Sequence, residues 1–130
     1  MNKNKIFAGL VLAIFLLAIP QVVNAGDATR DIEFSGEYLS NNGISGEING
    51  EIVDENLDGT MIIRGLEYPI HLTLVMKRGD LEWYSGTITR CGREFGIRMI
   101  LRISTSAEII RGAFGCPELN FDGYFTALIE

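Results

Sequence analysis

Apolar and polar residues alternate along most of the chain after residue 30, and β-branched and aromatic residues are frequent among the apolar ones. Short clusters of Gly, Asn and Asp interrupt this alternation. A period of two with such interruptions is typical of antiparallel strands joined by hairpins, whereas an amphipathic helix repeats every 3.6 residues. We therefore predict an all-β domain with eight strands, at Ile32–Leu39, Ile44–Val53, Thr60–Leu66, Ile70–Lys77, Leu81–Arg90, Glu94–Ile103, Glu108–Phe114 and Phe121–Ile129.

In several of these segments a glycine shares a strand face with large apolar residues. A glycine on an inner face gives up packing area, so it marks either tight curvature of the sheet or room for another group. This favours a single small antiparallel eight-stranded up-and-down barrel, with a two-sheet β-sandwich as the alternative. The glycines concerned are Gly36, Gly46, Gly50, Gly65, Gly112 and Gly123. In the strand at 94–103, Gly96 instead falls on the polar face, so we expect either a bulge there or a one-residue slip in the alignment of the two halves.

The two halves of the predicted domain share short motifs. Ser35–Gly36 recurs as Ser85–Gly86 at an offset of 50 residues, and Ile62–Gly65 recurs as Ile109–Gly112 at an offset of 47. The matches fall on corresponding strands, so the simplest interpretation is two four-stranded meanders related by a pseudo-twofold axis. The alternative is coincidence in a glycine-rich β chain.

The first 25 residues have the composition of a cleavable signal peptide. Lys3 and Lys5 precede an uncharged apolar run at Ile6–Ile19, and the segment ends in small residues at Ala25. This is the order of a secretory signal, and the run is shorter than the roughly 20 residues that cross a bilayer as a helix. We predict a signal peptide at 1–25, a single β domain at 26–130 with no membrane span, and a periplasmic or secreted location.

The charge of the predicted mature domain argues against two classes of partner. The chain has 11 basic and 17 acidic residues, and removing the leader takes away only the two lysines near the N-terminus. Nucleic acids and anionic membranes bind cationic surfaces, so we expect neither as a partner. The chain has no phosphate-binding loop, and we expect no cofactor. The partner is then an unidentified small ligand or protein.

Two cysteines, Cys91 and Cys116, are present. In an oxidising compartment, two cysteines in a small domain most simply form a disulfide. Neither has a second cysteine at metal-ligand spacing. We therefore predict a disulfide between Cys91 and Cys116.

Candidate chemistry is sparse in this sequence. The one histidine, His71, lies on the polar face of a predicted strand without a nucleophile motif, so we predict that the protein is not an enzyme. Asp54, Asn56 and Asp58 have the spacing of the first ligands of a calcium loop, but the twelfth position of such a loop is Gly65 instead of an acid. We interpret this segment as an acidic hairpin turn and as a weak calcium candidate.

The basic residues concentrate between Arg90 and Arg102. Arg98 and Arg102 share a strand face, and together with Trp83 they form a possible surface site. Two alternatives stay open: these arginines pair with acidic residues of neighbouring strands, or Trp83 points inward and Tyr84 outward.

These features predict an exported, non-enzymatic binding module. We expect a small apolar or amphipathic ligand inside the barrel or at its mouth, because glycines on the inner face can leave space. The alternative is a protein-interaction module, such as a periplasmic inhibitor or an envelope accessory factor.

Overall fold

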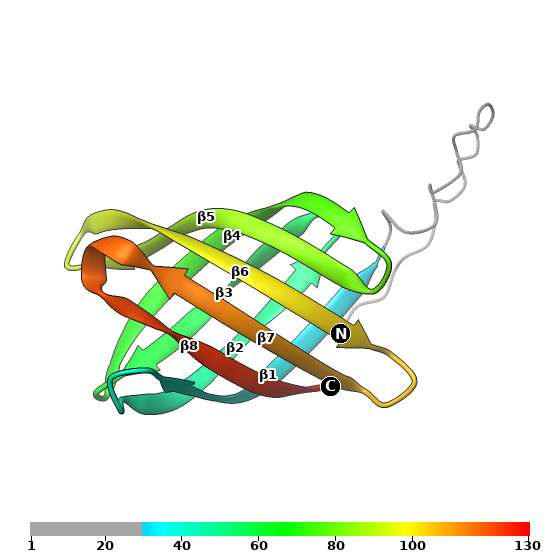
Figure 1. Ribbon diagram of the computed structural model, residues 1–130, viewed down its shortest axis with the longest axis horizontal. Helices are drawn as coiled ribbons and strands as arrows, with labels where there is room; N and C mark the ends of the chain where they lie inside the picture. Colours follow the sequence, from blue (N-terminus) through cyan, green and yellow to red (C-terminus); the bar gives the residue numbers. More distant parts are fainter. Residues whose placement is uncertain (1–29) are drawn as a thin grey trace.

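The computed structural model describes residues 30–130, so the predicted signal peptide and its cleavage point lie outside the described residues. The chain forms a closed barrel in which successive strands pair antiparallel and the last strand closes on the first (Figure 1). The elements are β1 (Asp31–Ser40), β2 (Ser45–Val53), β3 (Asn56–Ile63), β4 (Leu66–Arg78), β5 (Leu81–Arg90), β6 (Arg93–Ser104), β7 (Ile109–Cys116), the 3-10 turn η3 (Pro117–Leu119) and β8 (Phe121–Ile129).

The predicted eight-stranded up-and-down barrel is confirmed, and β5 and β8 have the predicted bounds. The prediction for β3 is wrong, since this strand begins at Asn56 instead of Thr60. It ends at Ile63 because the next two residues, Arg64 and Gly65, both have positive φ (53° and 83°) and make the turn themselves. Two consecutive residues with positive φ are typical of the tight turns that match the twist of a hairpin.

The position of this turn also argues against part of the predicted internal repeat. Ile62–Gly65 spans the end of β3 and a turn, whereas Ile109–Gly112 is the beginning of β7. The match at an offset of 47 therefore has no structural counterpart. Gly36 and Gly86 do share an environment, because a Cβ on either would approach a backbone oxygen of the neighbouring strand within 2.0 Å.

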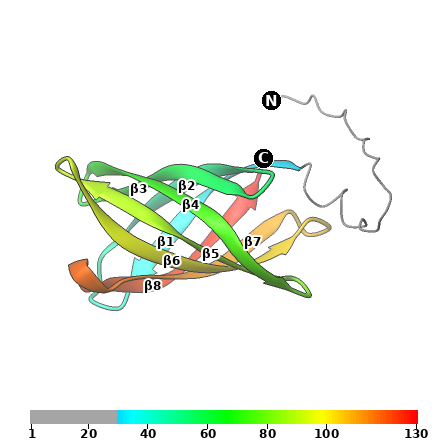
Figure 2. The same cartoon turned by 90° about the horizontal axis from the view of Figure 1, so that it is seen from above.

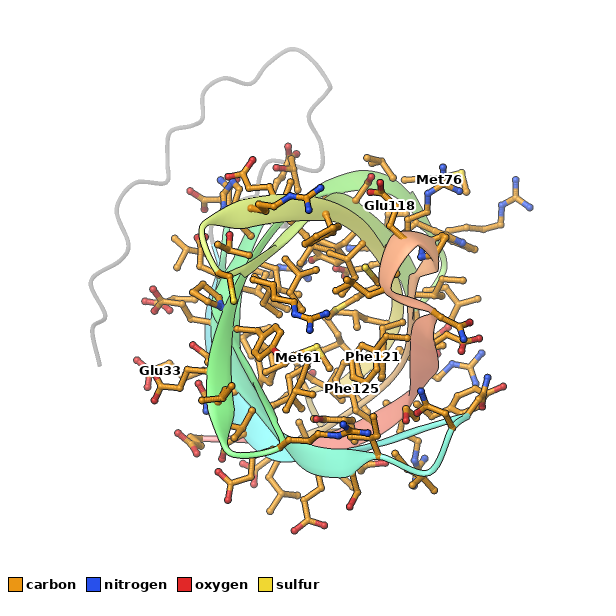
Figure 3. All side chains as sticks on the ribbon, turned by 90° about the vertical axis from the view of Figure 1, so that its left-hand side faces the viewer. Glu33, Met61, Met76, Glu118, Phe121 and Phe125 are labelled. Carbon is orange, nitrogen blue, oxygen red and sulfur yellow. The ribbon has the colours of Figure 1, made fainter. Side chains whose placement is uncertain are left out.

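The barrel interior is an apolar core to which every strand contributes (Figure 3). The alternation predicted from the sequence holds, and in β6 Ile97, Met99 and Leu101 point inward while Gly96 and Arg98 are exposed. The alternative of a bulge in β6 is wrong, because β6 pairs regularly with both neighbours. The register instead shifts between β4 and β5, between Leu74 and Met76. A bulge of this kind bends a strand and helps a sheet to close.

The interpretation that inner glycines leave open space is wrong. A Cβ at Gly36, Gly46 or Gly123 would lie within 2.2 Å of a backbone oxygen, and one at Gly112 would lie 2.4 Å from the Phe125 ring. Gly65 is not in the barrel wall at all. These glycines permit close approach of coiled strands, and the interior is filled by side chains.

The closed barrel has two different ends. The turns after β1, β3, β5 and β7 gather at one end, which we call the mouth, and Figure 2 shows η3 and the β5–β6 hairpin both at this end. The turns after β2, β4 and β6 gather at the opposite end, together with Arg30 and the C-terminus. Within the described residues, no helix is long and apolar enough to cross a membrane.

Candidate functional site

A hollow of about 270 Å³ lies at the mouth. The turns and strand ends that meet there bring together side chains that are far apart in the sequence. Its walls are both apolar and polar, and the lining residues are Asn42, Ile44, Ile63, Arg64, Tyr68, Arg90, Leu119 and Phe121. Such a mixture of apolar surface and a few polar groups is typical of small-molecule sites.

The floor of the mouth rests on an aromatic cluster. The rings of Tyr38, Phe114 and Phe121 contact one another with centroids 5.0–5.8 Å apart, two of the three pairs edge to face. The Tyr38 hydroxyl donates a hydrogen bond of 2.6 Å to the carbonyl oxygen of Ile62. Burial, with a smaller effect of Tyr68, raises the pKa of Tyr38, so this hydroxyl stays neutral. The floor is therefore rigid, apolar and uncharged.

The rim of the mouth carries two guanidinium groups. Arg64 belongs to the β3–β4 turn and has a positive φ of 53°, and Arg90 is the last residue of β5. No carboxylate lines this hollow, and within residues 30–130 neither arginine takes part in an ion pair. A guanidinium presents five N–H donors and no acceptor, so this rim suits an anionic group.

An internal ion pair occupies the opposite end. Arg30 donates two hydrogen bonds, of 2.7 and 2.5 Å, to the Glu82 carboxylate, and a third of 2.8 Å to the Tyr84 hydroxyl. Tyr84 in turn donates to Glu82 at 2.7 Å. The Glu82 side chain is only 4% exposed and that of Arg30 is 20% exposed. These hydrogen bonds compensate the buried Glu82 carboxylate, as a buried charge requires.

Two opposing effects set the pKa of Glu82. Burial alone would raise it, but hydrogen bonds from Arg30 and Tyr84 and the positive charges of Arg30 and Lys77 outweigh burial, so the pKa is lowered. Burial and the contact with Glu82 raise the pKa of Tyr84. The pair therefore stays ionised at neutral pH, and the tyrosine stays neutral.

The predicted Cys91–Cys116 disulfide is not present, since both cysteines are free thiols. Cys91 is exposed in the β5–β6 turn with a φ of 51°, and Cys116 is buried at the end of β7. Arg98 pairs with Gly115, so the register puts Cys116 level with Ile97, six residues beyond Cys91. At about 3.3 Å per residue this separates the cysteines by roughly 15–20 Å, too far for a disulfide. The β5–β6 hairpin extends past the end of β7, which the order of turns alone did not reveal.

The calcium candidates do not converge on one point. Asp54 is in the β2–β3 turn, while Asn56 and Asp58 are part of β3. The Asp58 carboxylate contacts the imidazole of His71, and Asn56 accepts a hydrogen bond of 3.5 Å from Thr73. Within the described residues, no three acidic, histidine or cysteine side chains are grouped to hold a metal ion.

His71 lies on the exposed outer wall, as the alternation predicted. Its side chain is 59% exposed and that of Asp58 is 56% exposed. An exposed pair of this kind contributes little to stability.

The structure brings together Trp83, Arg98 and Arg102, as the sequence suggested. All three point outward from β5 and β6, with Ile100 directly opposite Trp83. Tyr84 is the inward residue, which settles the register at this position. Arg102 makes an exposed ion pair of 3.3 Å with Asp80, while Arg98 lies opposite Ser85 and Gly115.

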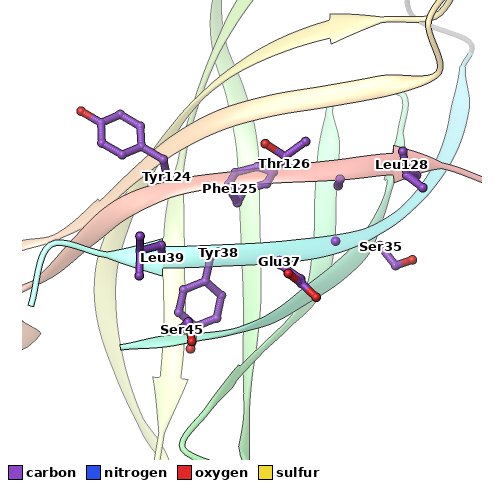
Figure 4. Close-up of a pocket in the computed structure, with 11 residues that line it drawn as sticks. Ser35, Glu37, Tyr38, Leu39, Ser45, Tyr124, Phe125, Thr126 and Leu128 are labelled. Atoms are coloured by element: carbon purple, nitrogen blue, oxygen red, sulfur yellow. The ribbon is translucent and has the colours of Figure 1, made fainter. Parts of the chain in front are cut away.

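A second, open hollow of about 760 Å³ lies on the outer wall between β1 and β8. Figure 4 shows Leu39 and Tyr124 beside it on these adjacent strands. Gly36 and Ala127 line it too, although both occupy positions that face the barrel interior. This groove carries no basic group, in contrast to the mouth.

Reasoning from sequence suggested a site inside the barrel or at its mouth, but it named none of the residues that form the site at the mouth, and it missed the Arg30–Glu82 pair. Alternation could have indicated the pair, because Glu82 has the same parity as the inward residues Tyr84 and Ile88. The mouth gave no such signal, because Arg64 and Arg90 belong to different turns and meet only when the barrel closes. No protein-family model, curated protein or solved structure matches the chain.

Proposed function

We propose that this protein is a non-enzymatic binding module that holds a small amphipathic anion at the mouth of the barrel. The observation that carries the proposal is the combination of two guanidinium groups, Arg64 and Arg90, above an apolar floor. The anionic head would accept hydrogen bonds from the guanidinium groups. The apolar part would cover Ile44 and Leu119, which are partly exposed at the mouth, above the buried ring of Phe121.

The filled interior supports a site at the mouth in preference to one inside the barrel. Close-packed interiors leave no room for a ligand, and the side chains beneath the mouth are almost fully buried. With a volume of about 270 Å³, the mouth suits a small molecule or the end of a longer chain. We expect binding to weaken as salt is added, because the rim is open to solvent.

Isothermal titration calorimetry with decanoate, kept below its micellar concentration, tests the proposal. Decanol and decyltrimethylammonium carry the same tail with a neutral and a cationic head, and inorganic phosphate is an anion without a tail. We expect decanoate to bind measurably tighter than all three. The variant Arg64→Gln/Arg90→Gln should weaken decanoate binding at least about tenfold, since charge-assisted hydrogen bonds contribute about 1.5–3 kcal/mol.

Arg78→Gln is the control for the loss of a guanidinium charge, because it makes the same kind of substitution once at the opposite end of the barrel. We expect it to leave the affinity within about twofold. Equal binding of decanoate and decanol, an equal effect of the control, or no binding of decanoate to the parent protein would contradict the proposal.

A further inference from the structure

An unbroken row of apolar side chains crosses six strands on the outer wall, which we call the apolar row. Each member is the direct cross-strand partner of the next. The row consists of Leu39 (β1), Tyr124 (β8), Ala113 (β7), Ile100 (β6), Trp83 (β5) and Met76 (β4). Four of them are large and well exposed: Leu39 59%, Tyr124 67%, Ile100 40% and Met76 45%. A contiguous exposed patch of this kind marks a contact surface.

Charged residues flank the apolar row on both sides, and the sign of the charge changes along the row. On one side, Asp122 (β8) and Arg98 (β6) lie in the same cross-strand row, both paired with Gly115. On the other side, Glu37 (β1) is followed by Thr126, Arg111 and Arg102. Both flanks are therefore acidic near β1 and β8 and basic near β6.

We propose that two copies of this chain pack face to face through the apolar row, related by a twofold axis that runs along β7. This operation places β8 of one copy over β6 of its partner. Tyr124 then meets the partner's Ile100 on each side of the axis, while β1 and β5, which are four strands apart in the closed barrel, curve away from the contact. Ala113, the smallest member, meets its own copy at the axis, where close approach is needed. An isologous contact requires such self-complementarity.

The same operation matches the charges. Asp122 faces the partner's Arg98, and Glu37 comes near the partner's Arg102, which also pairs with Asp80 of its own chain. A twofold axis along the row would instead place β6 over the partner's β6, so that Arg98 would face the partner's Arg102. One like-charged contact remains, between Arg111 and its own copy beside the axis.

The groove between β1 and β8 lies at the edge of this contact. It borders Leu39 and Tyr124 and has an open volume of about 760 Å³ (Figure 4). None of the residues that line the mouth belongs to the row, so the dimer leaves the mouth open.

Sedimentation velocity over a wide concentration range tests the dimer. We expect the parent chain to shift from monomer to dimer as concentration rises. Tyr124→Ser should weaken association at least about tenfold, because it removes a large aromatic contact from the interface. Leu66→Ser is the matched control, since Leu66 is 63% exposed on β4 but outside the row. We expect Leu66→Ser to associate as the parent does.

A charge swap separates a second copy from any other occupant of this face. Asp122→Arg and Arg98→Glu should each abolish the dimer, and the double variant should restore it, because the swapped charges again face each other across the twofold axis. Arg111→Ser should tighten the dimer. A parent chain that stays monomeric at every concentration, or a double variant that stays monomeric, would overturn the proposal. Such a result would indicate that the apolar row contacts a different protein instead of a second copy.

Discussion

Gly86 in β5 gives the sharpest test of the filled barrel. A Cβ added at this position would lie 1.9 Å from the carbonyl oxygen of His71 and 2.6 Å from the Cα of Leu72, both in the backbone of β4. Real Cβ atoms essentially never approach closer than 3.0 Å, so the two strands would have to separate by more than 1 Å. A rigid backbone cannot move aside as a flexible side chain does.

The cost of Gly86→Ala follows from this geometry. Overpacking costs about 1–3 kcal/mol, and separating the strands weakens ladder hydrogen bonds that contribute about 1 kcal/mol each. We expect a loss of about 3 kcal/mol or more. For a domain of about 100 residues this lowers the melting temperature by roughly 12–24 °C.

Gly96→Ala is the matched control, in the strand that pairs with β5. A Cβ at Gly96 meets no atom within 4 Å, and its φ is not positive. We expect this variant to be stabilised by about 0.4–1 kcal/mol, because alanine restricts the unfolded chain. Thermal melts of both variants by circular dichroism measure the difference. Similar melting temperatures for the two would refute the idea that the inner glycines are sites of close backbone contact.

Four further outcomes are expected. Glu82→Leu should cost about 3 kcal/mol in urea unfolding, because it leaves Arg30 without its carboxylate, while Arg30→Met/Glu82→Leu should stay within about 1 kcal/mol of the parent. The folded-state pKa of Glu82 lies below 4.5. The parent alone therefore has a stabilising contribution that is present above about pH 4.5 and is lost as the pH falls further. Glu51 lies directly between two other acids on the outer wall, so Glu51→Lys should raise stability by about 1 kcal/mol, measured by the same method. Millimolar calcium should leave the melting temperature unchanged, whereas a rise that disappears in Asp54→Ala would show that the acidic turn binds the ion. Intact mass of exported protein should correspond to a chain that begins at or near Gly26, and a mass that retains the leader would exclude cleavage there.

The barrel could be predicted from sequence because its determinants are local. Alternation sets which residues of each strand point inward, and it gave the correct faces even in β6, where Gly96 breaks the glycine pattern. The positions of the turns were predicted less accurately than the faces of the strands. Asp-Gly at residues 58–59 resembles a turn, but it lies inside β3, and the turn is made four residues earlier, at residues 54–55. Pairing with β2 and β4 keeps residues 58–59 in the strand. The local sequence does not reveal which strands will pair with a segment.

The candidate sites depend on longer distances, and prediction was weaker there. Trp83, Arg98 and Arg102 were found because two adjacent strands joined by a short turn bring them together. The Cys91–Cys116 pairing was wrong because the hairpin lengths, which only the register reveals, set the cysteines apart. The mouth and the apolar row each draw on most of the strands, so they exist only in the closed barrel.

The most direct test of the proposed mouth site is a titration of the isotope-labelled protein with decanoate, followed by backbone amide NMR. We predict saturable shifts confined to the mouth, at Asn42, Ile44, Arg64 and Leu119, with none at Leu72 or Ile88 in the core. Shifts that centre on the core residues, or on Ile100 and Tyr124 of the outer wall, would contradict binding at the mouth.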